Sequence, residues 1–279
     1  MDRPRSRPSG TGAPGSAGWT QAIATLWIVS VACSALLAAV LPLADPLAMD
    51  LTAPSSPPGR LHLLGTDPLG RDILSRVLYG ARASLTVGLF APALGLLVGG
   101  IAGLAAGYYR GRVEASIMIV IDTLLAFPGI VLALALAAVL GPGLFNLVLT
   151  LGVVSVPAFA RVSRAHTLSV AERDFVLAAR ALGFGPARIV LRHVLPNVLP
   201  HLLSLALVVV AVMIVAEGAL SFLGLGIAPP QPSWGSLIAD GRDYLEESPH
   251  ISLVPAAVLS LTVLSLTVLA DSVRTRAGP

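Results

Sequence analysis

The chain has 279 residues, of which 55% are hydrophobic and 12% charged, and its mean hydropathy is +0.85. These values exclude an ordinary soluble domain, which carries about twice that share of charge, and they predict a protein with several membrane spans. All 18 basic residues are arginine, so the chain lacks the lysine that a phosphate-binding P-loop or a Schiff-base enzyme requires. The arginines do not gather on one basic face, so we expect no nucleic-acid partner.

The N-terminal 43 residues divide into a polar and an apolar part. Residues 1–20 are rich in Pro, Gly and Ser and contain three arginines, so we predict a disordered cytoplasmic tail. An apolar run follows, and we predict the first transmembrane helix over residues 21–43. A cleaved signal peptide is the alternative, but its apolar core is usually about 7–15 residues long, and this run is longer.

Residues 44–82 are predicted to form an outer loop that contains an amphipathic surface helix. Within "GTDPLGRDILSRVLYGARASL", Asp67 suits the N-cap position and Pro68 the first helical position. The spacing places an apolar face opposite a polar one, and such a helix would lie along the membrane surface. The apolar face would contain Leu69, Ile73, Leu74, Val77 and Leu78, and the polar face Arg71, Asp72 and Arg76, with Asp72 and Arg76 four residues apart.

Residues 83–274 are predicted to form a core domain with five more spans, followed by a short tail at 275–279. Each span approaches the ~20 apolar residues that a bilayer requires, although the fourth span of the chain is short. The spans are Ser84–Gly107, Ser116–Leu140, Leu144–Ala160, Val198–Leu223 and Ile251–Ala270. The fold class is therefore an all-α membrane protein with six transmembrane helices. Kinks are expected at Pro92, Pro128 and Pro157.

The distribution of arginine predicts the orientation. With the N-terminus inside, thirteen arginines fall on inner segments and five on outer segments. Cytoplasmic loops carry the excess of basic residues, so we predict that both termini are cytoplasmic.

The longest predicted cytoplasmic connection is residues 161–197. Ser169 and Glu172 have the spacing of a capping box, which predicts a helix that begins near Val170. Gly183 would end this helix. Gly185–Pro186 would open a second short helix that stops at Pro196. The first helix has an apolar face of Phe175, Ala178, Ala179 and Leu182, and an exposed face of this kind usually docks on a partner.

This connection resembles the EAA loop of ABC importer permeases. The family pattern is Glu-Ala-Ala, three residues, Gly, nine residues, Ile, one residue and Leu-Pro. The chain has Leu177-Ala178-Ala179, Gly183, His193 and Leu195-Pro196 at the same spacing. Leu177 replaces the family's Glu and His193 its Ile, which puts in doubt a salt bridge from position 177.

Two further segments resemble the C-type permeases of dipeptide, oligopeptide and nickel importers. They are "HLLGTDPLGRDILSRVLYGARASL" and "ALSFLGLGIAPPQPSWGSLIADGRDYL". Together the three motifs cover most of residues 61–274. The resemblance implies the type I importer permease fold in a bacterial inner membrane, and a permease subunit for di- or oligopeptides. A nickel or other small-solute importer remains an alternative, and an ion-coupled secondary transporter is the alternative from another class.

The resemblance also implies the partners of the chain. These are a second permease subunit, two ATP-binding cassette ATPases, an extracytoplasmic solute-binding protein and the surrounding lipid bilayer. No cofactor is expected in this chain, since ATP and Mg²⁺ would bind the ATPases. The residues that would couple to the ATPases are Phe175, Leu177, Ala178, Ala179, Arg180, Leu182, Gly183, Leu195 and Pro196.

Three residues outside the connection are further candidates. Asp122 and Glu217 are acids within predicted spans, where an ionisable group is costly and often functional. Each could face the translocation path or link two helices by hydrogen bonds. Trp234 could anchor at the outer interface or touch the binding protein. No histidine pair has the spacing of a metal site, so we expect neither a metal site nor a catalytic residue.

Overall fold

The computed structural model describes residues 16–276, with side chains for residues 18–273. Helices make up most of this range, and the longest connection without a helix, residues 38–72, contains an isolated bridge between Thr66 and Asp72. Five helices are long and apolar enough to cross a membrane, and a bent pair of shorter helices forms a sixth span if it is counted as one. The predicted all-α membrane fold is therefore confirmed.

Five long helices build the bundle, and short helices join them. The long ones are α1 Ser16–Leu37, α2 Ile73–Tyr109, α5 Leu144–Ala171, α8 Leu195–Phe222 and α10 His250–Arg276. The short ones are α3 Gly111–Leu125, α4 Gly129–Leu140, α6 Asp174–Ala181, α7 Pro186–Ile189 and α9 Trp234–Asp240. A π-helical turn, η1, covers Val190–Val194, and a 3₁₀ turn, η2, covers Arg242–Tyr244.

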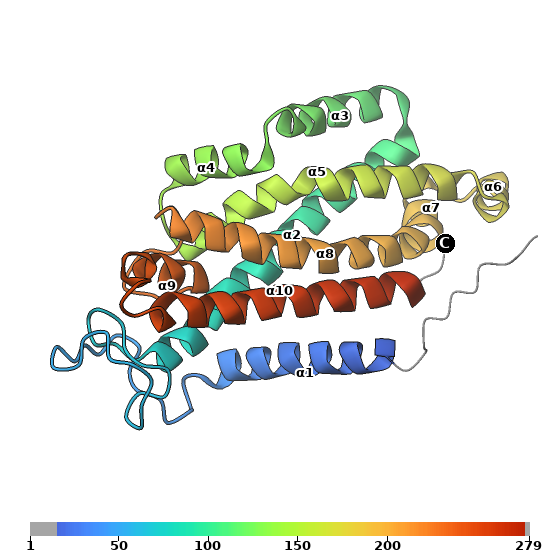
Figure 1. Ribbon diagram of the computed structural model, residues 1–279. Coiled ribbons are helices and arrows are strands. Elements are labelled where there is room, and N and C mark those ends of the chain that lie inside the picture. The colour runs from blue at the N-terminus through green and yellow to red at the C-terminus, as the bar shows by residue number, and fades with distance from the viewer. Residues whose placement is uncertain (1–15, 277–279) are drawn as a thin grey trace, which may run out of the picture.

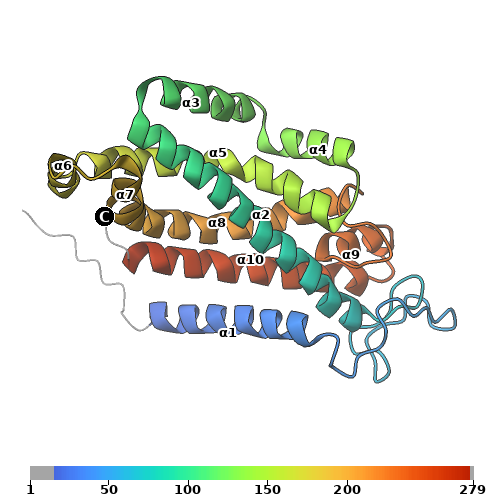
Figure 2. The ribbon, with the colours of Figure 1, turned by 180° about the vertical axis from the view of Figure 1, so that it is seen from behind.

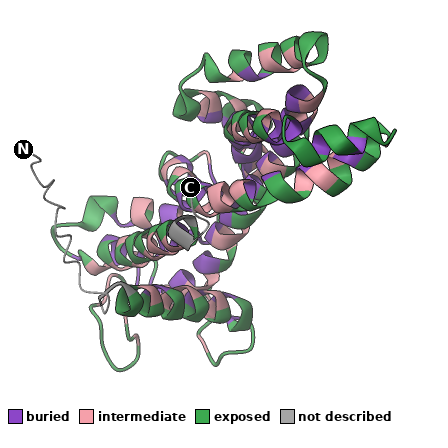
Figure 3. Cartoon of the chain, turned by 90° about the vertical axis from the view of Figure 1, so that its right-hand side faces the viewer, coloured by how far each residue is buried: buried purple, intermediate pink, exposed green. Residues whose placement is uncertain are grey.

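The long helices run side by side, with α6 and α7 at one end of the bundle and α9 at the other (Figures 1 and 2). Helix α1 begins and α10 ends at the same end as α6. This arrangement agrees with the predicted topology, in which both termini and the loop at 161–197 are cytoplasmic. Buried residues lie where helices meet, and exposed residues cover much of the outward sides (Figure 3).

The predicted ends of the chain need correction. Helix α1 begins at Ser16 and ends at Leu37, so the first span lies about five residues earlier than 21–43. Helix α10 includes residues 275 and 276, which were predicted as tail. The rest of the predicted tails, 1–15 and 277–279, lies outside the described residues.

The prediction of a separate surface helix before the second span is wrong. Residues 65–72 form a loop, and the helix that starts at Ile73 continues without a break to Tyr109. Its N-cap is Asp72, whose carboxylate accepts a 2.8 Å hydrogen bond from the Ser75 amide. Asp67 instead folds the loop, where it accepts hydrogen bonds from the amides of Leu69 and Arg71.

The first turns of α2 are buried rather than exposed to solvent, since Ile73, Ser75 and Val77 are 2%, 0% and 4% exposed. Arg76, predicted on an exposed face, is buried and donates to Asp240 of α9 at 3.2 Å. The predicted pair of Asp72 and Arg76 is therefore replaced, since Asp72 contacts His62 at 2.9 Å. Partial burial raises the pKa of the Asp240 carboxyl, and the guanidinium groups of Arg76 and Arg71 oppose that shift.

The third predicted span is broken at Pro128. Helices α3 and α4 meet there at 88°, and Pro128 is the N-cap residue of α4. The residue before a proline avoids the helical conformation and the proline has no N–H, which together explain the break. Pro92 and Pro157, by contrast, lie inside the continuous helices α2 and α5.

The closest helix pair of the bundle is α2 and α5. Gly95, Gly99, Gly103 and Gly107 recur every four residues on the face of α2 that touches α5. A Cβ at Gly99 would collide with the carbonyl oxygen of Val156. Small residues let helix backbones approach closely in a membrane, so this glycine row fixes how the two helices pack.

Neighbouring glycines of α2 test this packing. Gly99→Ala should lower the free energy of unfolding by about 1–3 kcal/mol because its methyl group overpacks the seam. Gly100→Ala is the matched control, since its Cβ would make only ordinary contacts, with the side chains of Leu202 at 3.5 Å and Leu96 at 3.8 Å. It should be neutral or stabilising by up to ~1 kcal/mol. Equilibrium unfolding in detergent compares them, and equal effects would contradict the packing.

Candidate functional site: the cytoplasmic hairpin and the helices it joins

The hairpin, residues 172–194, connects α5 to α8 and contains α6, α7 and η1. The predicted capping box is wrong, because α5 continues through Ser169 to Ala171. Glu172 is the C-cap of α5, and α6 begins two residues later. The Glu172 carboxylate accepts a 2.7 Å hydrogen bond from Arg110, which follows α2. The acid therefore ties the hairpin to the end of α2 rather than capping a helix.

Helix α6 ends at the predicted glycine in a full Schellman motif. Gly183 has φ +77°, a left-handed conformation that glycine adopts readily. The Phe184 amide donates to the carbonyl of Ala179 at 3.1 Å, and the Gly183 amide donates to that of Arg180 at 3.0 Å. The turn between the two legs of the hairpin is thus defined by backbone hydrogen bonds.

One side of α6 is buried in the main core of the bundle. Val176 is 0% exposed and Ala179 is 4% exposed, and both belong to the hydrophobic cluster that contains Ile189 and Val194 of the second leg. The sequence analysis placed Ala179 on an outward face and missed Val176. Val176 and Ala179 are three residues apart and therefore share a helix face. This spacing was the signal that could have revealed the inner face.

The other side of α6 carries an apolar stripe on the surface. Phe175, Ala178 and Leu182 follow one another at intervals of three and four, so they share a face. Phe175 is 40% exposed and Leu182 is 73% exposed. Leu177, beside the stripe, is exposed too. We name Phe175, Ala178 and Leu182 the docking stripe, because it is apolar surface that the described part of the chain leaves uncovered.

Aromatic and cationic side chains brace the hairpin from within. The Arg180 guanidinium lies 5.2 Å from the ring centre of Tyr108 in α2. Arg188 lies 4.5 Å from the ring centre of Phe184, and that ring stacks near His193. Cation–π contacts of this kind stabilise modestly at exposed sites. They hold both legs against each other and against α2.

The second leg of the hairpin does not stop at Pro196 as predicted. Residues Pro186–Phe222 form one continuous apolar segment, in which the Leu195 amide donates to the carbonyl of Val190 in a π-type bond. Pro196 lies in the first turn of α8, directly after the π-turn. Leu195 and Pro196 therefore belong to the start of α8, which joins the hairpin to the span, and not to the docking stripe.

Glu217 is fully buried and joins three helices. Its carboxylate accepts hydrogen bonds from Ser84 of α2 at 2.8 Å and from Ser221 of α8 at 2.7 Å. The Trp234 amide of α9 donates to the same Ser84 hydroxyl at 3.3 Å. In this chain the acid thus links helices, and its side chain has no surface on which to meet a solute.

Trp234 has a different place from the one predicted. It is 0% exposed and its indole N–H donates to the carbonyl of Val77 at 3.1 Å. A buried side chain cannot anchor at the lipid interface or touch a binding protein, so both interpretations are wrong for this chain. The helix start at Ser233 explains the burial, because its capping box turns Trp234 inward against α2.

Asp122 lies on the surface of α3 and pairs with Arg161 of α5 at 2.8 Å. Both side chains are 59% exposed, and nearby Glu114 pairs with Arg164 in the same way. These pairs tie α3 to α5 near the cytoplasmic end. Within residues 16–276 no group of three or more His, Cys, Asp or Glu is placed to hold a metal ion.

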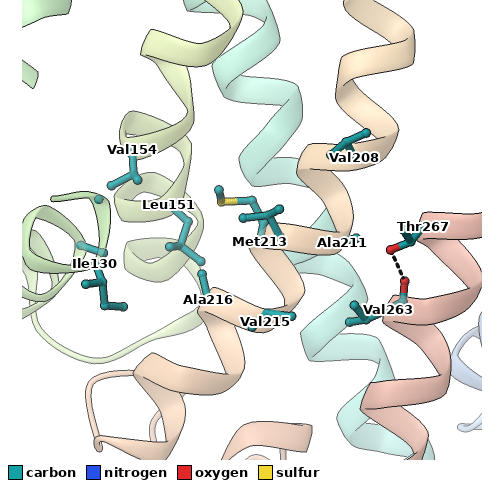
Figure 4. A pocket seen from close by; sticks show the side chains of 13 residues that line it. Ile130, Leu151, Val154, Val208, Ala211, Met213, Val215, Ala216, Val263 and Thr267 are labelled. Atoms are coloured by element: carbon teal, nitrogen blue, oxygen red, sulfur yellow. Dashed lines mark hydrogen bonds between the residues drawn. The ribbon is translucent and has the colours of Figure 1, made fainter. Parts of the chain in front are cut away.

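An apolar cavity of about 440 Å³ opens between α4, α5, α8 and α10 (Figure 4). Its wall on α8 includes Val208, Val212 and Val215, and Leu151 of α5 lies opposite. None of the lining residues is charged. The sequence analysis did not predict this cavity, because a uniformly apolar helix gives no signal of which side faces a partner and which faces lipid.

A bundle of apolar spans that continue into an exposed hairpin defines a polytopic membrane protein. Residues 95–279 match the family model described as binding-protein-dependent transport system inner membrane component. The chain belongs to this family, and it is a permease component of the inner membrane.

Named relatives support the assignment. The chain is 41% identical over 252 residues to a putative peptide transport system permease protein of Brucella suis, which covers 90% of this chain and 85% of that protein. It is 39% identical over 222 residues to a glutathione transport system permease of Pectobacterium atrosepticum (80% and 74%). A di/tripeptide transport system permease of Pseudomonas aeruginosa is 41% identical over 217 residues (78% and 72%).

A solved structure of the inward-facing MetNI methionine ABC transporter is similar in fold. The TM-score is 0.61 at 18% identity, and the match covers 73% of this chain and 97% of that chain. At this identity the likeness shows the fold alone. It confirms the predicted importer permease architecture.

Substitutions at Gly183 and Gly185 test whether the turn requires a residue with positive φ at position 183. A Cβ at either position would meet no atom within 4 Å, but only Gly183 has a positive φ. Gly183→Ala should therefore lower the free energy of opening of α6 by about 1–2 kcal/mol, and Gly185→Ala should not lower it. Amide hydrogen exchange of residues 174–184 measures this free energy, and equal exchange in both variants would contradict the motif.

Two variants of Glu217 test its linking role. Glu217→Ala leaves the hydroxyl of Ser84 without its buried acceptor, which should cost about 1–3 kcal/mol of unfolding free energy. Glu217→Gln retains an acceptor oxygen and should cost less. Thermal unfolding of the purified chain compares the two. If the alanine variant were as stable as the wild type, the buried hydrogen bonds would not hold α2 to α8.

Proposed function

We propose that this chain is one of two permease subunits that together form the translocation pathway of an ATP-driven importer for di- and oligopeptides. The named relatives support the solute class, since they include peptide, di/tripeptide and glutathione transport permeases. A nickel or other small-solute importer would use the same arrangement, so the solute is the part of the proposal that rests most on these relatives.

The observation that carries the proposal is the docking stripe on a helix that is fixed to the bundle. An uncovered apolar stripe at the cytoplasmic end is suited to a partner. We assign it to ATP-binding cassette subunits, one for each permease, which would hold the ATP and Mg²⁺. An extracytoplasmic binding protein would deliver the solute at the end of α9.

The contacts inside the hairpin suit transmission of force. Val176 and Ala179 are buried in the core of the spans, and Pro186–Phe222 is one continuous segment. A push on Leu182 would therefore displace α5 and α8 rather than bend the hairpin alone. An ion-coupled secondary transporter, the alternative class, has no need of such a stripe.

The residues that line the apolar cavity in Figure 4 would form this chain's part of the wall of the pathway. No charged side chain lines it, so it cannot hold the charged termini of a peptide tightly. Weak binding of the peptide favours its transport, because a solute must be able to leave the pathway as well as enter it. Selection among peptides is then left to the binding protein.

Charges placed on the docking stripe test the assignment. Ala178→Asp and Leu182→Asp should each reduce co-purification of the ATPases and peptide uptake by about tenfold or more, which corresponds to ~1.4 kcal/mol. Both positions are exposed, so folding is retained. Ala179→Asp is unsuitable, because it would put a charge into the core.

Val113→Asp is the matched control, since it puts the same charge on an exposed apolar residue of α3 outside the hairpin. It should leave co-purification and uptake unchanged. Unchanged behaviour of both stripe variants would contradict the docking site. Uptake by the chain alone in liposomes with an ion gradient would establish the secondary-transporter alternative.

A further inference from the structure

A second apolar groove lies on the cytoplasmic half of the bundle, between α2 and the segment from α7 to α8. Its volume is about 840 Å³. Leu97 and Ile101 form one wall, and Leu191, Leu195 and Leu199 form the other. Tyr109, at the inner end, is its only lining residue with a polar side-chain group. In the chain alone, Ile101 and Leu191 are each 61% exposed.

This groove is lined by different helices from the cavity assigned to the pathway, apart from α8, which contributes to both. Leu195, Leu199 and Leu202 line the groove, and Val208, Val212 and Val215 line the cavity, thirteen residues further along in each case. Helix α2 lines only the groove, and α4, α5 and α10 line only the cavity. A solute in the pathway would not reach the groove.

Three arginines lie close in sequence to lining residues at the cytoplasmic end of the groove. Arg188 follows the lining residue Ala187, and Arg192 follows Leu191. Arg112 lies three residues after Tyr109 on the other side. All three side chains are exposed. Among residues 18–273 none of the three forms an ion pair, although the Arg188 guanidinium also lies 4.5 Å from the ring centre of Phe184, whereas Arg110 pairs with Glu172.

We propose that the groove binds an anionic phospholipid of the inner leaflet. An acyl chain would fill the apolar groove, and the phosphate would lie against Arg188 and Arg192. The nearby arginines favour an anionic lipid over a neutral one, because basic pockets between spans on the cytoplasmic side suit anionic headgroups. Guanidinium groups also match phosphate oxygens in geometry.

The position of the groove gives the lipid a consequence for the hairpin. Val190 and Leu191, which lie in the π-turn, form part of its wall. A bound acyl chain would therefore pack directly against the junction between the hairpin and α8. This inference concerns a lipid site and does not depend on which solute the permease carries.

The test uses the full chain in nanodiscs that contain equal amounts of phosphatidylglycerol and phosphatidylcholine. Native mass spectrometry of the released protein counts the retained lipids. The wild type should retain phosphatidylglycerol several-fold over phosphatidylcholine. Arg188→Gln with Arg192→Gln should abolish this preference, and Arg161→Gln, which removes an inner arginine away from the groove, should keep it.

A second pair of variants tests the groove itself. Ala105→Trp places a large side chain among the lining residues and should reduce retention of both lipids. Ala138→Trp, at an exposed alanine of α4, should not. Helical content by circular dichroism checks folding, and if Ala105→Trp fails to fold, the arginine variants decide.

Three results would overturn the proposal. They are equal retention of both lipids by the wild type, an unchanged preference in the double arginine variant, and a crosslink from Ile101→Cys to another protein subunit in the assembled transporter.

Discussion

Burial of one side of α6 in the core of the spans is the constraint on which the structure depends. Val176 and Ala179 pack into the same cluster as Ile189 and Val194, so the hairpin cannot be displaced without moving or breaking that core. Interiors of this kind are close-packed and transmit strain. The same helix therefore leaves its docking stripe free for a partner while its inner side holds it to α5 and α8.

Helix α2 extends this constraint across the membrane. It has 37 residues and is therefore about 55 Å long. At its inner end Tyr108 meets Arg180 of the hairpin, and three turns in from its outer end Ser84 bonds Glu217 beside Trp234. Between these ends the glycine row locks α2 to α5. A movement that starts at the hairpin thus has a packed route to the outer cap at α9.

The sequence predicted the features that depend on local chemistry and missed those that depend on packing. The spans follow from apolar length, and the turn at Gly183 follows from the need for a left-handed residue. The break at Pro128 follows from the missing amide. The predictions of a surface helix and of a capping box were wrong because the long helices α2 and α5 extend into those segments. The inward positions of Trp234 and Val176 and the two faces of α8 are set by helices distant in sequence, which no local pattern records.

A distance measurement within one chain tests the central claim that the hairpin and the spans move as one body. Spin labels at Arg173→Cys and Leu203→Cys, with Cys33 replaced by serine, place one probe on the hairpin outside the docking stripe and one on α8. Double electron–electron resonance on the assembled transporter, with and without ATP, gives their separation. The account predicts the same distance in both states while the hairpin moves relative to the second permease. A nucleotide-dependent change of several ångströms within the chain would contradict it.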